Sequence, residues 1–289
     1  GRTDGTFAYL ENVGSAIAPS LVERFANANP LDGLSAFFES APALVDLDGD
    51  GDLDLVAGSQ GGSFAYYANV GSRTNPSFVL RTGAANPLTG FSAGGSVAST
   101  LGDLDGDGDL DLVAGDFSGG VRSFENTGTR TSPAFVERTG AANPLSGQSV
   151  AAYAKPSLGD FDRDGDLDLV VGEFSGVLRY AENTGNASHP AFVSRPDEAN
   201  PLAGQDVGFT ASPAAGDLDR DGDLDLVSAN IDADSASVRF NDGSGEFSGT
   251  DNIGTGYRTL RVALGDLDGD GDLDLAALSR ELFDVTFWR

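Results

Sequence analysis

The chain has 289 residues and a formal net charge of −28, from 45 acidic and 17 basic side chains. This charge repels nucleic acid and anionic membranes, so it excludes both as direct partners and favours metal cations. There are no cysteines, which rules out disulfides and thiolate metal sites, and no apolar run reaches the roughly 18 residues of a membrane helix. Forty glycines indicate short strands joined by many turns.

One nine-residue pattern, close to Asp-Leu-Asp-Gly-Asp-Gly-Asp-Leu-Asp, occurs five times. The copies span 46–54, 103–111, 160–168, 217–225 and 266–274, and their starts lie 57, 57, 57 and 49 residues apart. A fixed long period indicates one supersecondary unit that is copied and is stable only against its neighbours. We therefore predict a single domain over residues 1–289, with units at about 1–44 (partial), 45–101, 102–158, 159–215, 216–264 and 265–289 (partial).

Each unit is predicted to form four short strands. A strand of small residues precedes the Asp pattern, as at 96–101, and an apolar strand follows it, as at 110–114. An alternating aromatic strand comes next, at 64–68, 121–125 and 177–181, and ends in an Asn-x-Gly turn. The fourth strand begins with proline, at 76–80, 133–137 and 190–194, which places it at a sheet edge where the missing N–H does little harm.

A linker containing Ala-Asn-Pro-Leu follows, at 28–31, 85–88, 142–145 and 199–202. We expect it to guide the chain from one unit to the next. The fourth full unit lacks this linker, which accounts for most of its shorter spacing. Four antiparallel strands per unit, ordered from inside to outside, are typical of a propeller blade. The predicted fold is an all-β propeller of about five four-stranded antiparallel blades, each with an Asp loop in its first hairpin.

The two ends of the chain are expected to share one blade. Residues 264–288 supply three strands, and residues 20–24 would add the outer strand and remove a sheet edge. A segment at 7–10 that resembles a third strand is left without a place in this scheme.

The Asp loops have the composition of calcium sites, because Ca²⁺ takes six to eight oxygen ligands from a loop that turns alternate side chains inward. Loop positions 1, 3, 5 and 9 are Asp in every copy, the carbonyl of position 7 is the expected fifth ligand, and Gly at position 6 allows the sharp turn. We predict about five Ca²⁺ ions. The candidate residues are Asp46, Asp48, Asp50, Asp52 and Asp54; Asp103, Asp105, Asp107, Asp109 and Asp111; Asp160, Asp162, Asp164, Asp166 and Asp168; Asp217, Asp219, Asp221, Asp223 and Asp225; and Asp266, Asp268, Asp270, Asp272 and Asp274.

The alternative is that these segments are solvated turns, which is the usual interpretation of a single Asp-Gly pair. Five copies in register favour metal, and they hold 25 of the 45 acidic residues. Mg²⁺ is disfavoured because it prefers a rigid octahedron with several waters. Zn²⁺ lacks its nitrogen and sulfur ligands here, since the chain has one His and no Cys.

These loops, together with the Asp-Gly-Asp-Leu-Asp-Leu run that enters a strand ending in Gly, resemble the FG-GAP/VCBS repeats of bacterial surface proteins and of integrin α-subunit propellers. The Asn-Thr-Gly, Pro-x-Phe-Val and Ala-Asn-Pro-Leu segments resemble the bacterial branch. The resemblance implies that the calcium loops stabilise the ring on the face opposite the partner-binding face. Integrin-type propellers have seven blades, so a count of about five departs from that pattern.

The opposite face is expected to carry the turns between second and third strands and the linkers. Residues expected there are Gln60, Asp116, Phe117, Glu173, Phe174 and Asp232. Phe117 and Phe174 are either contacts for a sugar or protein partner or rings packed against their own blade.

The resulting functional hypothesis is a calcium-stabilised, non-catalytic binding or adhesion propeller with a protein or glycan partner, either alone or as a module or subunit of a larger surface assembly. We expect a secreted or cell-surface location, because millimolar extracellular calcium fills even weak sites. The alternatives are a carbohydrate-binding lectin propeller and a polysaccharide-processing enzyme domain. His189, the only histidine, lies in a variable turn and is a poor catalytic candidate; a carboxylate pair among Asp116 and Glu173 is the remaining enzyme hypothesis.

Overall fold

The computed structural model describes residues 6–7, 9–12, 21–36, 41–95, 97–195, 199–203, 207, 209–230, 234–254, 259–265, 273–279 and 285–288. These residues form β-strands and loops, with short 3-10 helices η1 (Ala26–Ala28), η2 (Gly83–Ala85) and η3 (Gly140–Ala142) in the linkers. None of the described helices is long and apolar enough to cross a membrane.

Four antiparallel sheets have four strands each, hydrogen-bonded in chain order. The first blade holds β3 (Ala41–Val45), β4 (Asp54–Gly58), β5 (Phe64–Asn69) and β6 (Phe78–Arg81). The second holds β7 (Ala98–Gly102), β8 (Asp111–Gly115), β9 (Val121–Asn126) and β10 (Phe135–Arg138). The third holds β11 (Lys155–Gly159), β12 (Asp168–Gly172), β13 (Leu178–Asn183) and β14 (Phe192–Arg195). The fourth holds β15 (Ser212–Gly216), β16 (Asp225–Asn230), β17 (Ser235–Asn241) and β18 (Phe247–Gly254).

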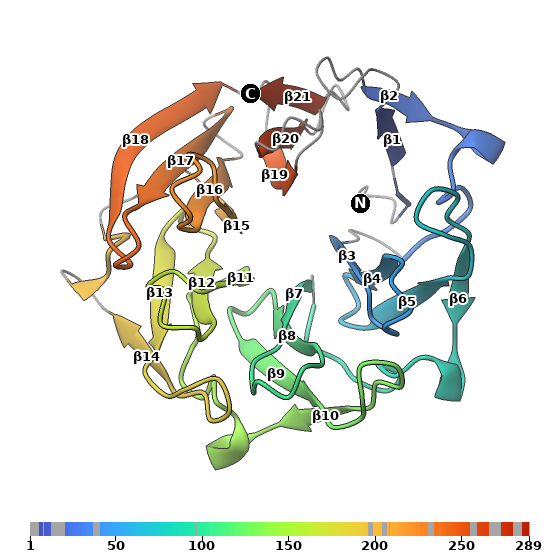
Figure 1. Ribbon diagram of the computed structural model, residues 1–289, viewed down its shortest axis with the longest axis horizontal. Helices are drawn as coiled ribbons and strands as arrows, with labels where there is room; N and C mark the ends of the chain where they lie inside the picture. The colour runs from blue at the N-terminus through green and yellow to red at the C-terminus, as the bar shows by residue number, and fades with distance from the viewer. Residues whose placement is uncertain are drawn as a thin grey trace.

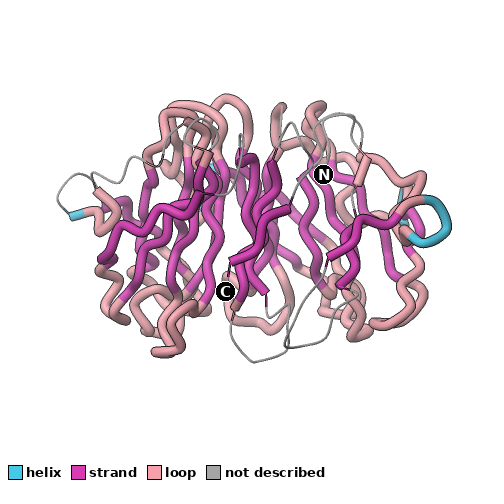
Figure 2. Tube along the Cα trace, turned by 90° about the horizontal axis from the view of Figure 1, so that it is seen from above, coloured by secondary structure: helices cyan, strands magenta, loops and turns pink. Residues whose placement is uncertain are grey.

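The sheets are arranged as sectors of a ring, with the first strand of each blade innermost and the fourth at the rim (Figure 1). Seen from the side, the strands run between two faces and the loops gather at both (Figure 2). Because the strands are antiparallel, the Asp loops share one face with the turns between third and fourth strands. The turns between second and third strands lie on the other face, together with the linkers that lead into each new blade. The predicted propeller arrangement is therefore confirmed.

The predicted number of about five four-stranded blades is wrong for the described residues, which form four. The fifth Asp pattern belongs to a three-stranded sheet of β19 (Thr259–Gly265), β20 (Asp274–Ser279) and β21 (Val285–Trp288). We expected residues 20–24 to supply its fourth strand.

The segment expected to supply this strand pairs with another strand, so the predicted shared blade is also wrong. β2 (Leu21–Arg24) pairs with β1 (Tyr9–Asn12), and their register aligns Tyr9 with Arg24. In the first complete blade, Tyr66 is aligned with Arg81 in the same way, 57 residues later. β1 and β2 are thus the third and fourth strands of a blade. Pairing of two neighbouring strands closes a short loop, which costs less entropy than pairing across the whole chain.

The hydrophobic core lies between blades, as expected for units that cannot bury their own faces. One buried cluster joins Val56 and Phe64 of the first blade to Leu112 and Phe124 of the second. Equivalent clusters join the second blade to the third and the third to the fourth. Burial of this apolar area, at about 25 cal/mol per Å², stabilises each blade only when its neighbour is folded.

Candidate metal centres

Each described Asp loop connects the first strand of a blade to the second, at 46–54, 103–111, 160–168 and 217–225. Gly at position 6 has a positive φ in all four loops, for example +95° at Gly51. Position 4 is also left-handed, and it is Gly in the first two loops but Arg163 (φ +61°) and Arg220 (φ +64°) in the next two. The sequence indicated the position 6 turn, whereas the second left-handed position was missed.

Carboxylate oxygens from three Asp side chains converge in every described loop, all within 4.8 Å of one another. Positions 1 and 3 contribute in each loop; position 5 completes the first and third clusters, and position 9 completes the second and fourth. The clusters are Asp46, Asp48 and Asp50; Asp103, Asp105 and Asp111; Asp160, Asp162 and Asp164; and Asp217, Asp219 and Asp225. The structure therefore brings together the side chains that the sequence selected from positions 1, 3, 5 and 9, in sets of three.

Backbone N–H groups shape the loop from within. The position 3 carboxylate accepts the N–H of position 5, and the position 5 carboxylate accepts the N–H of position 7, as in Asp162, Asp164 and Asp166. The same two bonds recur in the other three loops. At position 1, the Oδ2 atom of Asp160 accepts the N–H of Gly165. These short Asx-type bonds hold alternate side chains on the inside of the loop.

The Asp at position 9 is also a buried hydrogen-bond acceptor. Asp168 is fully buried, and its two oxygens accept the N–H of Phe161, the N–H of Asn183 and the hydroxyl of Tyr180. Asp54, Asp111 and Asp225 accept the equivalent backbone N–H groups. Burial raises the pKa of Asp111 and of Asp168 to about 7. This carboxylate therefore links the loop to the third strand whether or not a cation is present.

Position 7 side chains stay outside the oxygen clusters, and the carbonyl ligand expected from this position stays a prediction. Asp109 and Asp223 are buried, and Asp52 is partly exposed. Burial raises the pKa of Asp109 to about 6, helped by the neighbouring carboxylate of Asp107.

Three position 1 carboxylates carry a buried oxygen that has no hydrogen-bond partner, namely Oδ1 of Asp46, Asp160 and Asp217. Unpaired buried oxygens are costly and rare in native proteins, so a bound water or ion is a standard explanation. Here each one lies in a group of three carboxylates, where a cation would both satisfy it and offset the mutual repulsion. The donor set consists of oxygen alone, which fits Ca²⁺.

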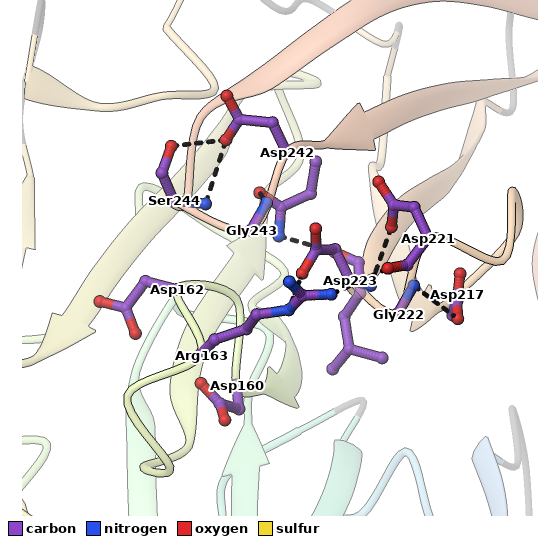
Figure 3. Close-up of polar contacts among 12 residues, drawn as sticks. Asp160, Asp162, Arg163, Asp217, Asp221, Gly222, Asp223, Asp242, Gly243 and Ser244 are labelled. Atoms are coloured by element: carbon purple, nitrogen blue, oxygen red, sulfur yellow. Dashed lines mark hydrogen bonds and ion pairs between the residues drawn. The ribbon is translucent and has the colours of Figure 1, made fainter.

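Neighbouring loops are linked through arginines that the sequence did not bring to notice. Arg163, at position 4 of the third loop, reaches the fourth loop, where its Nε atom forms an ion pair with Oδ1 of Asp223 and its NH2 group donates to the carbonyl of Asp221 (Figure 3). In the same way, Arg130 of the second blade contacts Oδ2 of Asp46 at 3.0 Å. The Arg at position 4 of the third loop, where the first two loops have Gly, is the sequence feature that could have indicated the contact made by Arg163.

The fifth loop is predicted from sequence alone: Asp266, Asp268, Asp270 and Asp272 lie outside the described residues, and Asp274 begins β20. Asp232 also lies outside them. His189 is exposed in the turn between β13 and β14, as expected.

The opposite face shows how the remaining expected residues are used. Asp116 and Glu173 are buried, and each accepts a serine hydroxyl and a backbone N–H, from Ser118 and Gly120 and from Ser175 and Ala151. These bonds give both carboxylates a structural role in their turns. Gln60 is exposed at the corresponding place in the first blade.

The Ala-Asn-Pro-Leu segments guide the chain, as expected. Asn86 and Asn200 donate through Nδ2 to the carbonyls of Phe64 and Leu178, and accept the N–H two residues later. The segment's leucine is fully buried at residues 88, 145 and 202.

Phe117 and Phe174 are about half exposed and pack against rings of the incoming linkers rather than only against their own blades. Phe117 contacts Tyr153 with ring centroids 4.5 Å apart, Tyr153 stacks on Phe174 at 5.4 Å, and Phe174 contacts Phe209 at 5.4 Å. The sequence missed Tyr153 and Phe209 because the linkers differ at these positions.

The chain is similar to several solved structures. A lectin of Agrocybe aegerita, whose structure is described in terms of recognition of non-reducing terminal N-acetylglucosamine, has a TM-score of 0.52 and 18% identity over 96% of this chain and 72% of the lectin. BBS1N in complex with ARL6DN gives a TM-score of 0.43 and 14% identity, covering 90% of this chain and 68% of that one. The V. cholerae biofilm matrix protein Bap1 gives 0.34 and 15%, covering 83% and 34%. No curated protein sequence matches the chain.

The FG-GAP-like repeat model matches four overlapping segments, 46–114, 103–171, 160–228 and 217–277, each of which begins at the first Asp of a loop. Together these segments cover residues 46–277, which include every strand of the four complete blades except β3. The chain therefore belongs to the FG-GAP-like repeat family.

Proposed function

We propose that this chain is a non-catalytic extracellular binding or adhesion propeller whose Asp loops hold Ca²⁺. The observation that carries the proposal is the group of three carboxylates in each described loop, with an unpaired buried oxygen at position 1 in three of the four loops. A bound Ca²⁺ would neutralise the carboxylates and cross-link the loop. The family match and the extracellular abundance of calcium support a secreted or cell-surface location.

The chain's own residues define the structural role of each loop. Positions 1, 3 and 5 offer oxygens, position 6 turns the backbone, and position 9 ties the loop to the third strand. An ion that binds only the folded chain adds about 4 kcal/mol per site at a thousandfold excess over Kd. Five such contributions, even discounted severalfold for non-additivity, are comparable with the roughly 5 to 15 kcal/mol by which domains are usually stable.

Thermal unfolding followed by circular dichroism, in calcium and in EGTA, tests this role. We expect a large loss of stability in EGTA across the whole protein, because every interface between blades depends on both neighbours. Replacement of Asp107 by Ala should lower the melting temperature of the entire chain in calcium. Coincident curves in the two buffers would show that the loops do not stabilise the fold.

A lectin function is the second candidate, and the exposed rings of Phe117, Phe174 and Phe209 favour it, since aromatic faces stack on sugars. The Agrocybe aegerita lectin supports this candidate only through its similar fold. A glycan array read with calcium-loaded protein distinguishes the two: a specific glycan signal supports the lectin, and a silent array supports a protein partner.

A further inference from the structure

The turn between the third and fourth strands of the second blade lies against the Asp loop of the first blade, and the same turn of the third blade lies against the second loop. A Cβ atom on Gly49, at position 4 of the first loop, would lie 2.9 Å from Cγ of Arg130. A Cβ atom on Gly106, at position 4 of the second loop, would lie 3.0 Å from the carbonyl oxygen of Ala187. Glycine at position 4 therefore lets the next blade's turn approach both loops closely.

The two turns have the same backbone but differ in charge. Each is closed by a pair of hydrogen bonds between its first and fourth residues, over 129–132 in the second blade and 186–189 in the third. Arg130 and Ala187 stand 57 residues apart, at the same place in the two turns. The first loop therefore faces a guanidinium, which stays charged at any ordinary pH, whereas the second loop faces an uncharged methyl group.

Arg130 contacts a carboxylate that belongs to the oxygen cluster of the first loop. In the other three described loops, Oδ2 of the position 1 Asp accepts the N–H of position 6, as Asp103 does from Gly108. In the first loop, Oδ2 of Asp46 accepts a hydrogen bond from NH2 of Arg130 at 3.0 Å. The other oxygen of Asp46 is buried without a hydrogen-bond partner. The guanidinium therefore neutralises one of the three carboxylates that would hold an ion.

A fixed positive charge beside a cation site has opposite effects on its empty and filled states. In the empty loop, the guanidinium of Arg130 offsets the mutual repulsion of Asp46, Asp48 and Asp50 and joins the second blade to the first. In the filled loop, the same charge repels a dication that shares the Asp46 carboxylate. One contact should therefore stabilise the metal-free chain and weaken metal binding by the first loop.

We propose that Arg130 is a built-in counter-ion that sets the calcium affinity of the first loop. It makes the first loop a weaker site than the second, and it replaces part of the ion's charge when the first loop is empty. This rests on the proposed calcium function and concerns the regulation of the same loops. The loops consequently fill in an order that the arginine dictates, with the second loop occupied at lower calcium concentrations than the first.

Terbium luminescence excited through tyrosine reports on the first loop, because Tb³⁺ is a luminescent substitute for Ca²⁺. Tyr66 donates its hydroxyl to Oδ2 of Asp54 in the first loop, and Tyr180 makes the equivalent bond to Asp168 in the third. All proteins in the test carry Tyr180→Phe to remove the signal of the third loop, and a further Tyr66→Phe variant gives the background. Displacement of terbium by calcium then measures the calcium affinity of the first loop.

Four variants separate the charge of the arginine from its bulk. Arg130→Ala copies the residue found at this place in the third blade, and Arg130→Lys keeps the charge. Ala187→Arg is the reciprocal change, which brings a guanidinium to the second loop. Arg122→Ala is the matched control, since Arg122 forms a 2.8 Å ion pair with Glu137 near the start of β9, at the end of the strand away from the loops.

We expect Arg130→Ala to bind calcium at the first loop roughly three- to tenfold more tightly, because repulsion between a single charge and a dication a few ångströms away is removed. Arg130→Lys should stay within about twofold of the parent, and Arg122→Ala should not change the affinity. In EGTA, Arg130→Ala should melt about 1 to 3 °C lower than the parent. The rise in melting temperature on adding calcium should be larger in Arg130→Ala, and smaller in Ala187→Arg by about 2 to 5 °C.

Unchanged or weaker calcium binding by Arg130→Ala would overturn the proposal, since the arginine would then be neutral or would support the site. An equal gain in Arg130→Lys would overturn it as well, because charge would not be the cause. If the parent binds calcium at the first loop and these differences are absent, only the role of Arg130 is refuted. If neither the parent nor Arg130→Ala gives a terbium signal above the Tyr66→Phe background, the proposed calcium function fails, and the role of Arg130 fails with it.

Discussion

Replacement of Asp160 by Asn should change stability in opposite directions with and without calcium. Asp160 is at position 1 of the third loop, within 4.8 Å of carboxylate oxygens from Asp162 and Asp164. An asparagine retains a carbonyl oxygen for the N–H of Gly165, so the shape of the loop is preserved. What the substitution removes is one negative charge and one strong calcium ligand.

The magnitude follows from the geometry. Two unit charges about 4.8 Å apart repel by about 1 kcal/mol in water, so removing one charge from a group of three relieves up to about 2 kcal/mol, less at physiological salt. With calcium at a thousandfold excess over Kd, a site that no longer binds loses about 4 kcal/mol. At roughly 2 to 4 °C per kcal/mol, the variant should melt a few degrees higher without metal and about ten degrees lower in calcium.

Thermal unfolding of the parent and the variant in EGTA and in calcium measures both shifts. Asp32→Asn is the control, because Asp32 is an exposed acidic residue outside the loops, and it should alter neither melting temperature appreciably. A shift of the same sign in both buffers would refute the reasoning, since it would mean that the carboxylates are not balanced against a cation.

Three further predictions concern pH, strain and packing. Burial raises the folded-state pKa of Asp111 and Asp168 to about 7, so the metal-free protein should bind extra protons when it is folded. Its melting temperature should therefore fall as the pH rises from about 4 to 7, and a rising melting temperature would contradict this. Arg163→Gly and Arg163→Ala both remove the ion pair with Asp223, but only glycine suits the left-handed backbone at this position. The Gly variant should therefore be more stable than the Ala variant by about 1 kcal/mol in urea unfolding, and equal stability would show that the backbone at residue 163 is not strained. A Cβ atom on Gly115 would lie 2.3 Å from the carbonyl oxygen of Ala154, so Gly115→Ala should cost about 1 to 3 kcal/mol by the same assay, and a neutral result would show that the blades can separate freely.

Features repeated in every unit could be predicted from the sequence. The period of 57 residues fixed the four strands of a blade, and the alternate Asp residues identified the side chains that converge. Position 9 was selected as a ligand for the same reason, but its burial and its bonds to the third strand depend on tertiary packing, which the spacing does not encode.

Features that differ between units were not predictable in the same way. Residues 21–24 could pair with the third strand β1, which is close in sequence, or with the third strand β21, which is distant, and they pair with β1. The contact between Arg163 and the fourth loop joins residues about 60 positions apart, and Phe174 contacts Tyr153 and Phe209 from dissimilar linkers. Each depends on how neighbouring blades are placed, which only the assembled ring shows.

Metal analysis of the chain after exhaustive dialysis into calcium buffer and removal of free ion is the most direct test of the central claim. Four described clusters and the fifth loop in the sequence predict close to five Ca²⁺ ions per chain. A content of one ion or none would contradict the account.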